Sequence, residues 1–224
     1  MSDVSRHIPH WHRTNKGEHR SPVVIIVMLV IALQYILPSE LALSFQHEIC
    51  LAEALLGLVL LAISPTRINK HHTPSRILSL ILTSIMTISN SSSAILLINH
   101  LVSGETKDPN RLLLSGGTIW LTNIIIFSLW FWDLDRGGPG ARAEAVNQHP
   151  DFMFPQMGDP GYAPEHWHPN FFDYLYTSFT NASAFSPTDV LPLTRWAKML
   201  MMIQSLTSLL TVGLIVARAV NILH

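Results

Sequence analysis

Charge is scarce in this sequence of 224 residues. Only 13% of the residues are Asp, Glu, Lys or Arg, whereas a soluble domain carries about 25%. The formal net charge is −1, so there is no basic field for nucleic acid and we expect no nucleic-acid partner. The single cysteine, Cys50, excludes an intramolecular disulfide framework and a metal site built from several thiolates.

Motifs for catalysis are missing too. The chain has no Gly-x-Ser-x-Gly elbow, no Walker loop, no His-Glu-x-x-His and no cysteine in a nucleophile setting. Its Gly-Asp-Pro-Gly and Gly-Gly-Pro-Gly stretches are typical of turns. We therefore expect no enzyme, no catalytic residue and no cofactor.

Apolar residues are abundant: they make up 48% of the chain, and the mean hydropathy is +0.31. Long apolar runs predict an all-α membrane protein with about five transmembrane helices. The first run follows a polar tail and ends without a cleavage site, so we expect a retained span. The five predicted spans are Pro22–Leu37 with an extension through Leu41 to Leu43, Ile49–Ile63, Ile77–Val102, Leu113–Trp132 and Trp196–Leu223.

The spans divide the chain into three regions. Residues 1–21 form a polar tail rich in basic residues and histidine, residues 22–112 hold three spans, and residues 113–224 hold the rest. Within the last region, the density of proline and glycine in the linker 133–170 forbids long helices. Its aromatic residues predict a cap packed on the membrane part.

The basic residues predict the orientation. With the N-terminus in the cytoplasm, eleven Lys and Arg residues fall inside and three fall outside, namely Lys107, Arg111 and Arg218. The positive-inside rule therefore favours this orientation, which places the linker 133–170 on the cytoplasmic side.

Polar residues inside two spans predict packed faces. The Ser89–Ser93 stretch is too polar to face lipid and is expected to face other helices. In the last span, Gln204, Ser208 and Thr211 share one helical face with Arg218. This face either lines a water-filled vestibule or makes hydrogen bonds between helices, with Arg218 snorkelling.

The stretch before the last span has an unusual composition. Asn170–Phe179 is aromatic, slightly amphipathic and too short to span, and a hydroxyl-rich segment without helical periodicity follows it. Irregular backbone is tolerated in a membrane only where protein buries it or where it lines a cavity. Residues 171–192 therefore predict a re-entrant loop, and a tight polar connection between helices is the alternative.

Residues 113–224 resemble the pore module of the tetrameric potassium-channel superfamily, which consists of an outer helix, a pore helix, a filter and an inner helix. Tyr176 and Ser178 match the end of the pore helix. Residues 185–189 lie over the filter motif Val-Gly-Tyr-Gly-Asp, and Pro192 and Arg195 match the proline and the basic residue that follow it. The resemblance implies a homotetramer that passes ions.

The filter departs from that family. Ser186 and Thr188 stand where the family has glycines, and Pro187 has a fixed φ, so the ladder of carbonyls cannot form. Side-chain oxygens and a carboxylate ring at Asp189 would favour monovalent cations without selecting K⁺. The predicted ion pathway comprises Thr180, Asn181, Ser183, Ser186, Pro187, Thr188 and Asp189, with Gln204, Ser208 and Thr211 as the lining of the inner helix.

The whole chain is also similar in layout to a bacterial family of five-span membrane proteins without an assigned activity. Those proteins end in a similar Ser-Phe-Thr … Phe-x-x-x-Asp segment before a last span, as Ser178–Thr180 and Phe185–Asp189 do here. This resemblance implies a place in the bacterial inner membrane. It leaves open a non-conducting protein, such as a small transporter or an accessory or scaffold subunit.

The remaining ionisable residues have two interpretations each. Twelve histidines include His7, His10 and His12, His71 and His72, and His166 and His168 beside Glu165. A metal site needs about four converging ligands, so solvated histidines are favoured and no metal is expected. Glu53 and His100 lie near span ends, where they snorkel or form hydrogen bonds. Asp133 and Asp135 form either an acidic vestibule or an ordinary span boundary.

Overall fold

The computed structural model describes residues 10–63, 65–103, 109–147, 149–162, 164, 166–184 and 189–223. Four of its helices are long and apolar enough to cross a membrane. An all-α membrane architecture is therefore confirmed at this level. The four helices are α2 (Gln46–Ile63), α3 (Thr73–Ser103), α4 (Pro109–Leu134) and α8 (Arg195–Leu223).

Helix α1 (Ser21–Ile36) is apolar but has only 16 residues. The predicted extension through Leu41 to Leu43 is wrong, because the helix ends before Pro38. Leu37 has φ −62° and ψ 138°, as expected for a residue whose helical conformation would clash with the following proline ring. A 3₁₀ turn, η2 (Ser39–Leu41), then leads towards α2.

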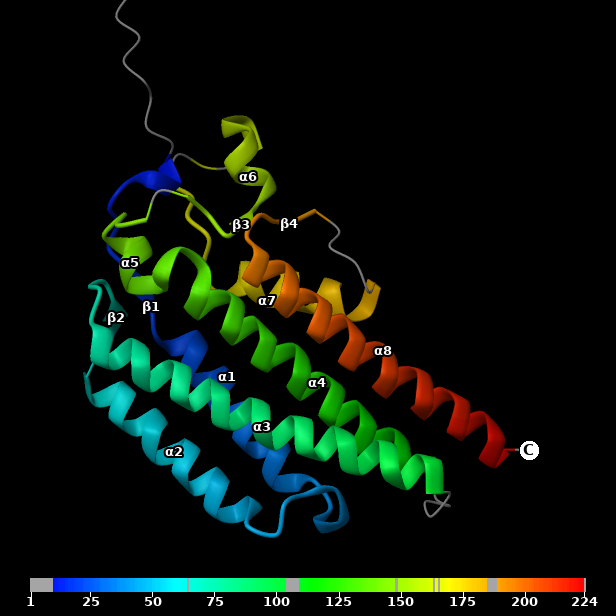
Figure 1. The fold of residues 1–224 in the computed structure, drawn as a ribbon. Helices are drawn as coiled ribbons and strands as arrows, with labels where there is room; N and C mark the ends of the chain where they lie inside the picture. Colours follow the sequence, from blue (N-terminus) through cyan, green and yellow to red (C-terminus); the bar gives the residue numbers. More distant parts are fainter. Residues whose placement is uncertain are drawn as a thin grey trace, which may run out of the picture.

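The helices form one bundle (Figure 1). Helices α1 to α4 run side by side, and α8 lies along α4. Helix α4 is central because it contacts α1, α3, α7 and α8. We call the end of the bundle where α4 ends and α8 begins the linker end; it also carries the connection from α2 to α3, and the C-terminus lies at the other end.

Short elements cover the linker end. They are η1 (His10–His12), η3 (Asp135–Gly137), α5 (Pro139–Ala143), α6 (Pro155–Gly158) and η4 (Pro160–Tyr162). Strand β1 (Glu18–His19) pairs antiparallel with β2 (Arg67–Ile68), and β3 (Phe152–Met153) pairs antiparallel with β4 (Leu191–Pro192). The linker forms no long helix among its described residues, as its prolines and glycines predict. Phe152 and Phe154 are buried, so this part of the linker packs on the bundle.

Helix α7 (Phe171–Ala184) is longer than the sequence suggests. It was expected to end near Phe179, and it continues through Thr180, Asn181 and Ser183. The Thr180 hydroxyl donates to the Tyr176 carbonyl at 3.0 Å and the Ser183 hydroxyl donates to the Phe179 carbonyl at 2.7 Å. Because these hydroxyls are satisfied inside the helix, they do not end it.

The start of α7 is capped. The Asn170 side chain accepts a hydrogen bond from the Phe172 N–H at 2.9 Å, and the Asp173 carboxylate accepts one from the Asn170 N–H at 2.8 Å. This reciprocal pair is a capping box with Asn and Asp in place of Ser or Thr and Glu. It sets where the helix begins.

Candidate functional site

The segment 171–192 begins and ends at the linker end. The Phe171 ring packs on the ring of Trp132 at 6.0 Å, near the end of α4, and the Phe179 ring packs on Trp120 at 6.4 Å. Helix α7 therefore runs about 21 Å along α4, which is about half of that helix's length. Beyond it, β4 pairs with β3, so the chain is again at the linker end.

The predicted ion-pathway residues occupy different surroundings. Thr180 is half-buried and Ser183 is exposed, whereas Asn181 is buried and faces α8. Asp189 is exposed. Ser186, Pro187 and Thr188 lie outside the described residues. The structure therefore does not bring Thr180, Asn181 and Ser183 onto one face.

Asn181 belongs to a hydrogen-bonded network between α7 and α8. Its Nδ2 donates to Gln204 Oε1 at 2.8 Å and to the Met201 carbonyl at 3.0 Å. Gln204 Nε2 donates to Ser178 Oγ at 2.6 Å, and the Ser178 hydroxyl donates to the Ile124 carbonyl of α4 at 2.6 Å. Gln204 is completely buried. The network thus ties α4, α7 and α8 together within one chain.

The polar face of α8 is turned into the bundle. Ser208 and Thr211 are buried as well, and Asn123 of α4 donates to Ser208 Oγ at 3.3 Å. In this arrangement the face makes hydrogen bonds between helices, and a vestibule-lining role for it stays a prediction. The outward face of α8 is apolar, with exposed Met199, Met202, Ile203, Leu206, Leu209 and Leu210.

A second polar network closes the linker end, and sequence reasoning missed it. The Tyr174 hydroxyl of α7 donates to Asp135 at 2.5 Å. Arg142 donates to the Asp135 carbonyl at 3.0 Å and pairs with Glu18 of the N-terminal segment at 2.8 Å. The Glu18 carboxylate also accepts from the Trp132 ring N–H at 2.7 Å. The only signal in the sequence is the group of charged residues that directly follows an aromatic span end.

Arg142 stays charged at this buried position. Burial alone would lower the pKa of its guanidinium group, but Tyr174, Glu18 and Asp135 act against burial and raise that pKa above its ordinary value. The guanidinium group also lies over the Tyr174 ring, 5.0 Å from the ring centroid. Arg142 is thus a permanent positive charge that holds α7 and the N-terminal segment on the end of α4.

Asp133 and Asp135 do not form an exposed acidic vestibule in the structure. Both are buried, and Asp133 accepts a hydrogen bond from the Ser79 hydroxyl of α3 at 2.5 Å. Asp135 also accepts from the backbone N–H of Asp151 at 2.9 Å. Their carboxylates connect neighbouring segments.

Glu53 does not snorkel. It is completely buried in α2. With the Gln34 side-chain amide oriented so that its nitrogen faces Glu53, that nitrogen lies 3.3 Å from each carboxylate oxygen and donates to them. Gln46 donates to Ser89 of α3 at 2.9 Å in the same cluster. The prediction that the Ser89–Ser93 stretch faces other helices is confirmed for Ser89, Asn90 and Ser93, which are buried.

The histidine clusters supply no metal centre within the part of the chain that the structure describes. No group of three or more His, Cys, Asp or Glu side chains there could hold a metal ion. His7 and Glu165 lie outside the described residues. His12 lies beside Arg136 and His149, and burial together with these neighbours lowers the pKa of its ring.

No known protein family, curated protein or solved structure matches this chain. The two resemblances stated above therefore rest on the sequence alone. Any function must be argued from the geometry of α4, α7 and α8 and from the surfaces around them.

Proposed function

We propose that this chain is a pore-loop protein of the bacterial inner membrane. In this proposal α1 is a fifth span, residues 171–192 are a re-entrant loop, and four copies surround a pore for monovalent cations. The observation that carries the proposal is a helix that covers about two thirds of a membrane's hydrocarbon core, α7, with both ends of its segment at the linker end. A helix of 14 residues covers about 21 Å of a hydrocarbon core about 30 Å thick.

The direction of α7 supports a preference for cations. Its N-terminus is capped at the linker end, and its C-terminus lies deeper along α4. The free carbonyl groups of a helix C-terminus carry a partial negative charge. Half-helices with this end at membrane depth coordinate Na⁺ or H⁺ in several transporters. Asp189, two residues before β4, would add a carboxylate ring towards the linker end in a tetramer.

The pore would be inverted relative to the potassium-channel arrangement. Basic residues gather at the linker end, where Arg20, Arg76 and Arg195 lie. The positive-inside rule puts that end in the cytoplasm, whereas the filter of the potassium-channel family normally lies on the outer side.

The second candidate is a non-conducting membrane protein, such as an accessory or scaffold subunit. One observation favours it: Gln204 and Ser208 form their hydrogen bonds within one chain, and the outward face of α8 is apolar. Such a face suits lipid or another apolar helix without a pore.

Ion flux from liposomes that contain the purified protein tests the proposal. We expect Na⁺ and K⁺ flux, and we expect Asp189→Asn to lower it because the variant removes the carboxylate ring. Asp159→Asn is the matched control, since Asp159 is an exposed carboxylate of the linker. Native mass spectrometry of the same sample should show a tetramer.

Two outcomes of these measurements would contradict the proposal. A monomer or dimer without Na⁺, K⁺ or H⁺ flux would overturn the pore and leave the non-conducting protein. Flux that falls equally in the Asp189 and Asp159 variants would remove Asp189 from the pathway.

A further inference from the structure

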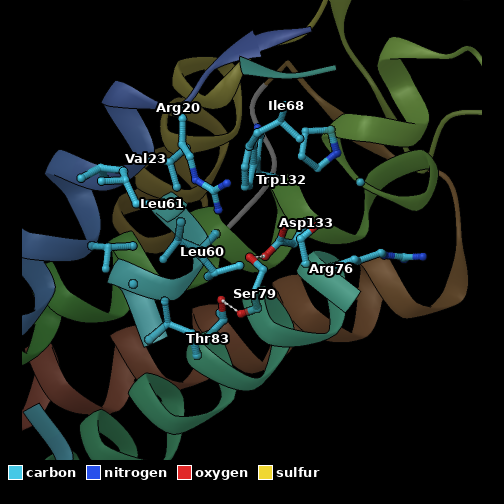
Figure 2. Close-up of a pocket in the computed structure, with 18 of the residues that line it drawn as sticks. Arg20, Val23, Leu60, Leu61, Ile68, Arg76, Ser79, Thr83, Trp132 and Asp133 are labelled. Carbon is cyan, nitrogen blue, oxygen red and sulfur yellow. Dashed lines mark hydrogen bonds between the residues drawn. The ribbon is translucent and has the colours of Figure 1, made fainter. Parts of the chain in front are cut away.

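A cavity opens between α1, α2 and α3 at the linker end, with α4 behind it (Figure 2). Its cavity volume is about 110 Å³, and the space around it is continuous with the open surface. It is separate from α7 and α8, which contribute no side chain to its wall. The cavity therefore needs an explanation of its own.

The deep part of the cavity is apolar and reaches the outer surface of the bundle. Val27 and Leu82 line its interior, while Met28 and Leu58 also line it and are 56% and 62% exposed. Gly57 of α2 leaves space there, because an added Cβ would meet only Val27 Cγ1, at 3.9 Å. The opening thus lies on helix faces that contact hydrocarbon when α1 and α2 cross a membrane.

The mouth of the cavity is basic. Arg20, Lys70 and Arg76 line it together with His71 and His72. Figure 2 shows the Arg20 side chain reaching inwards and Arg76 extending away from Asp133. Among the described residues, Asp133 is the only carboxylate in the wall, and it is buried against the Ser79 hydroxyl at 2.5 Å. Beside the mouth, the Glu144 carboxylate accepts a hydrogen bond from the His71 backbone N–H at 3.1 Å. Three cations against these two carboxylates leave an excess of positive charge.

Arg76 has a donor ready for a ligand. Its Nε is buried, and no acceptor of the described residues lies within hydrogen-bonding distance of it. A buried donor without a partner is costly. An anionic oxygen at the mouth would satisfy it.

We propose that this cavity binds one anionic phospholipid of the leaflet at the linker end. The phosphate lies at Arg76 and Lys70, and an acyl chain enters the space between α1 and α2 beside Gly57. Basic pockets between transmembrane helices on the cytoplasmic side are known to bind anionic lipid headgroups. A charged mouth above an apolar slot that opens to hydrocarbon matches the layout of a phospholipid and does not match that of a soluble anion.

Native mass spectrometry of delipidated protein titrated with dioleoyl phosphatidylglycerol tests the proposal, with dioleoyl phosphatidylcholine as the zwitterionic reference. Each basic residue near an anionic lipid contributes about fivefold in affinity. We therefore expect the double variant Lys70→Gln/Arg76→Gln to bind phosphatidylglycerol about 25-fold more weakly, whereas its affinity for phosphatidylcholine should stay nearly unchanged. Arg195→Gln/Lys198→Gln is the matched control, because these exposed basic residues of α8 lie outside the cavity.

A second pair of variants tests the slot independently. Gly57→Leu should fill the space beside Val27 and abolish tight binding of phosphatidylglycerol. Gly117→Leu adds the same side chain to α4, where nothing lies within 4 Å of an added Cβ, and should bind as the wild type does.

Three results would each overturn the proposal: equal affinity for the two lipids, equal losses in the two double variants, or unchanged binding by a folded Gly57→Leu. If Gly57→Leu does not fold, the two double variants decide the outcome. Neither set depends on whether the protein conducts ions.

Discussion

Tyr174 and Tyr176 stand two residues apart in α7 and have opposite surroundings. Tyr174 is completely buried and donates to Asp135, whereas Tyr176 is 51% exposed. The periodicity of a helix explains this, since residues two positions apart point to different sides. The sequence alone predicted a role only for Tyr176, as part of the resemblance to a pore helix.

Tyr174→Phe should lower the free energy of unfolding by about 1.5–3 kcal/mol. It removes a hydrogen bond to a buried carboxylate that stays in place. Tyr176→Phe is the control and should change stability by less than about 0.5 kcal/mol. Thermal or denaturant unfolding of both variants in detergent micelles measures the difference. Equal stability of the two would show that the bond to Asp135 contributes nothing.

Buried polar side chains could be located in the sequence, but their partners could not. The Ser89–Ser93 stretch and the stripe of Gln204 were recognised because polar residues interrupt apolar runs. The partner of Gln204 is Asn181, 23 residues away, and Arg142 pairs with Glu18 across 124 residues. Such pairs follow from packing, which local composition does not encode.

Among the helices, α4 and α8 approach closely at Gly116. A Cβ at that position would lie 2.1 Å from Ile215 Cδ1 of α8, whereas the neighbouring Gly117 faces open space. Small residues at helix contacts allow such an approach in membranes.

Gly116→Val should therefore destabilise the protein by about 1–3 kcal/mol, the usual cost of overpacking a close contact. Gly117→Val carries the same change in helix propensity and serves as the control. The comparison uses unfolding in micelles together with proteolysis at α8. If the two variants match, α8 does not pack on α4 at this point.

Helix α7 is longer than its composition predicts. A hydroxyl-rich sequence favours irregular backbone, yet the Thr180 and Ser183 hydroxyls donate to carbonyls of their own helix. The predicted extension of the first span past Pro38 is also wrong, although the reason can be read in the sequence: a proline disfavours the helical conformation of the residue before it.

At the scale of the whole molecule, the orientation in the membrane can be tested with single cysteines. Cys50 is the only native cysteine and is buried, so Cys50→Ala provides a background. Ser39→Cys lies between α1 and α2, and Val146→Cys lies in the linker; both positions are exposed. Three membrane-length helices, α2, α3 and α4, lie between these two positions in the chain.

We expect an impermeant maleimide to label Ser39→Cys from outside intact cells, and Val146→Cys only in inverted vesicles, because the basic linker end stays in the cytoplasm. The reverse pattern would put the linker end outside, as in the potassium-channel arrangement. Labelling of both from one side would contradict three crossings by α2, α3 and α4.

Hydropathy along the chain predicts a helical membrane protein and locates most of its spans, and the prolines and glycines predict a linker without a long helix, as its described residues show. Hydropathy, proline and glycine act locally, so these properties can be read along the chain. The packing of the helices shows what the sequence does not: the polar face of α8 contacts Asn181 and Asn123, Glu53 and Asp135 are buried, and Gly57 and Arg76 line one cavity. Hydrogen bonds and cavities are made by residues far apart in sequence, and their positions depend on how the helices pack.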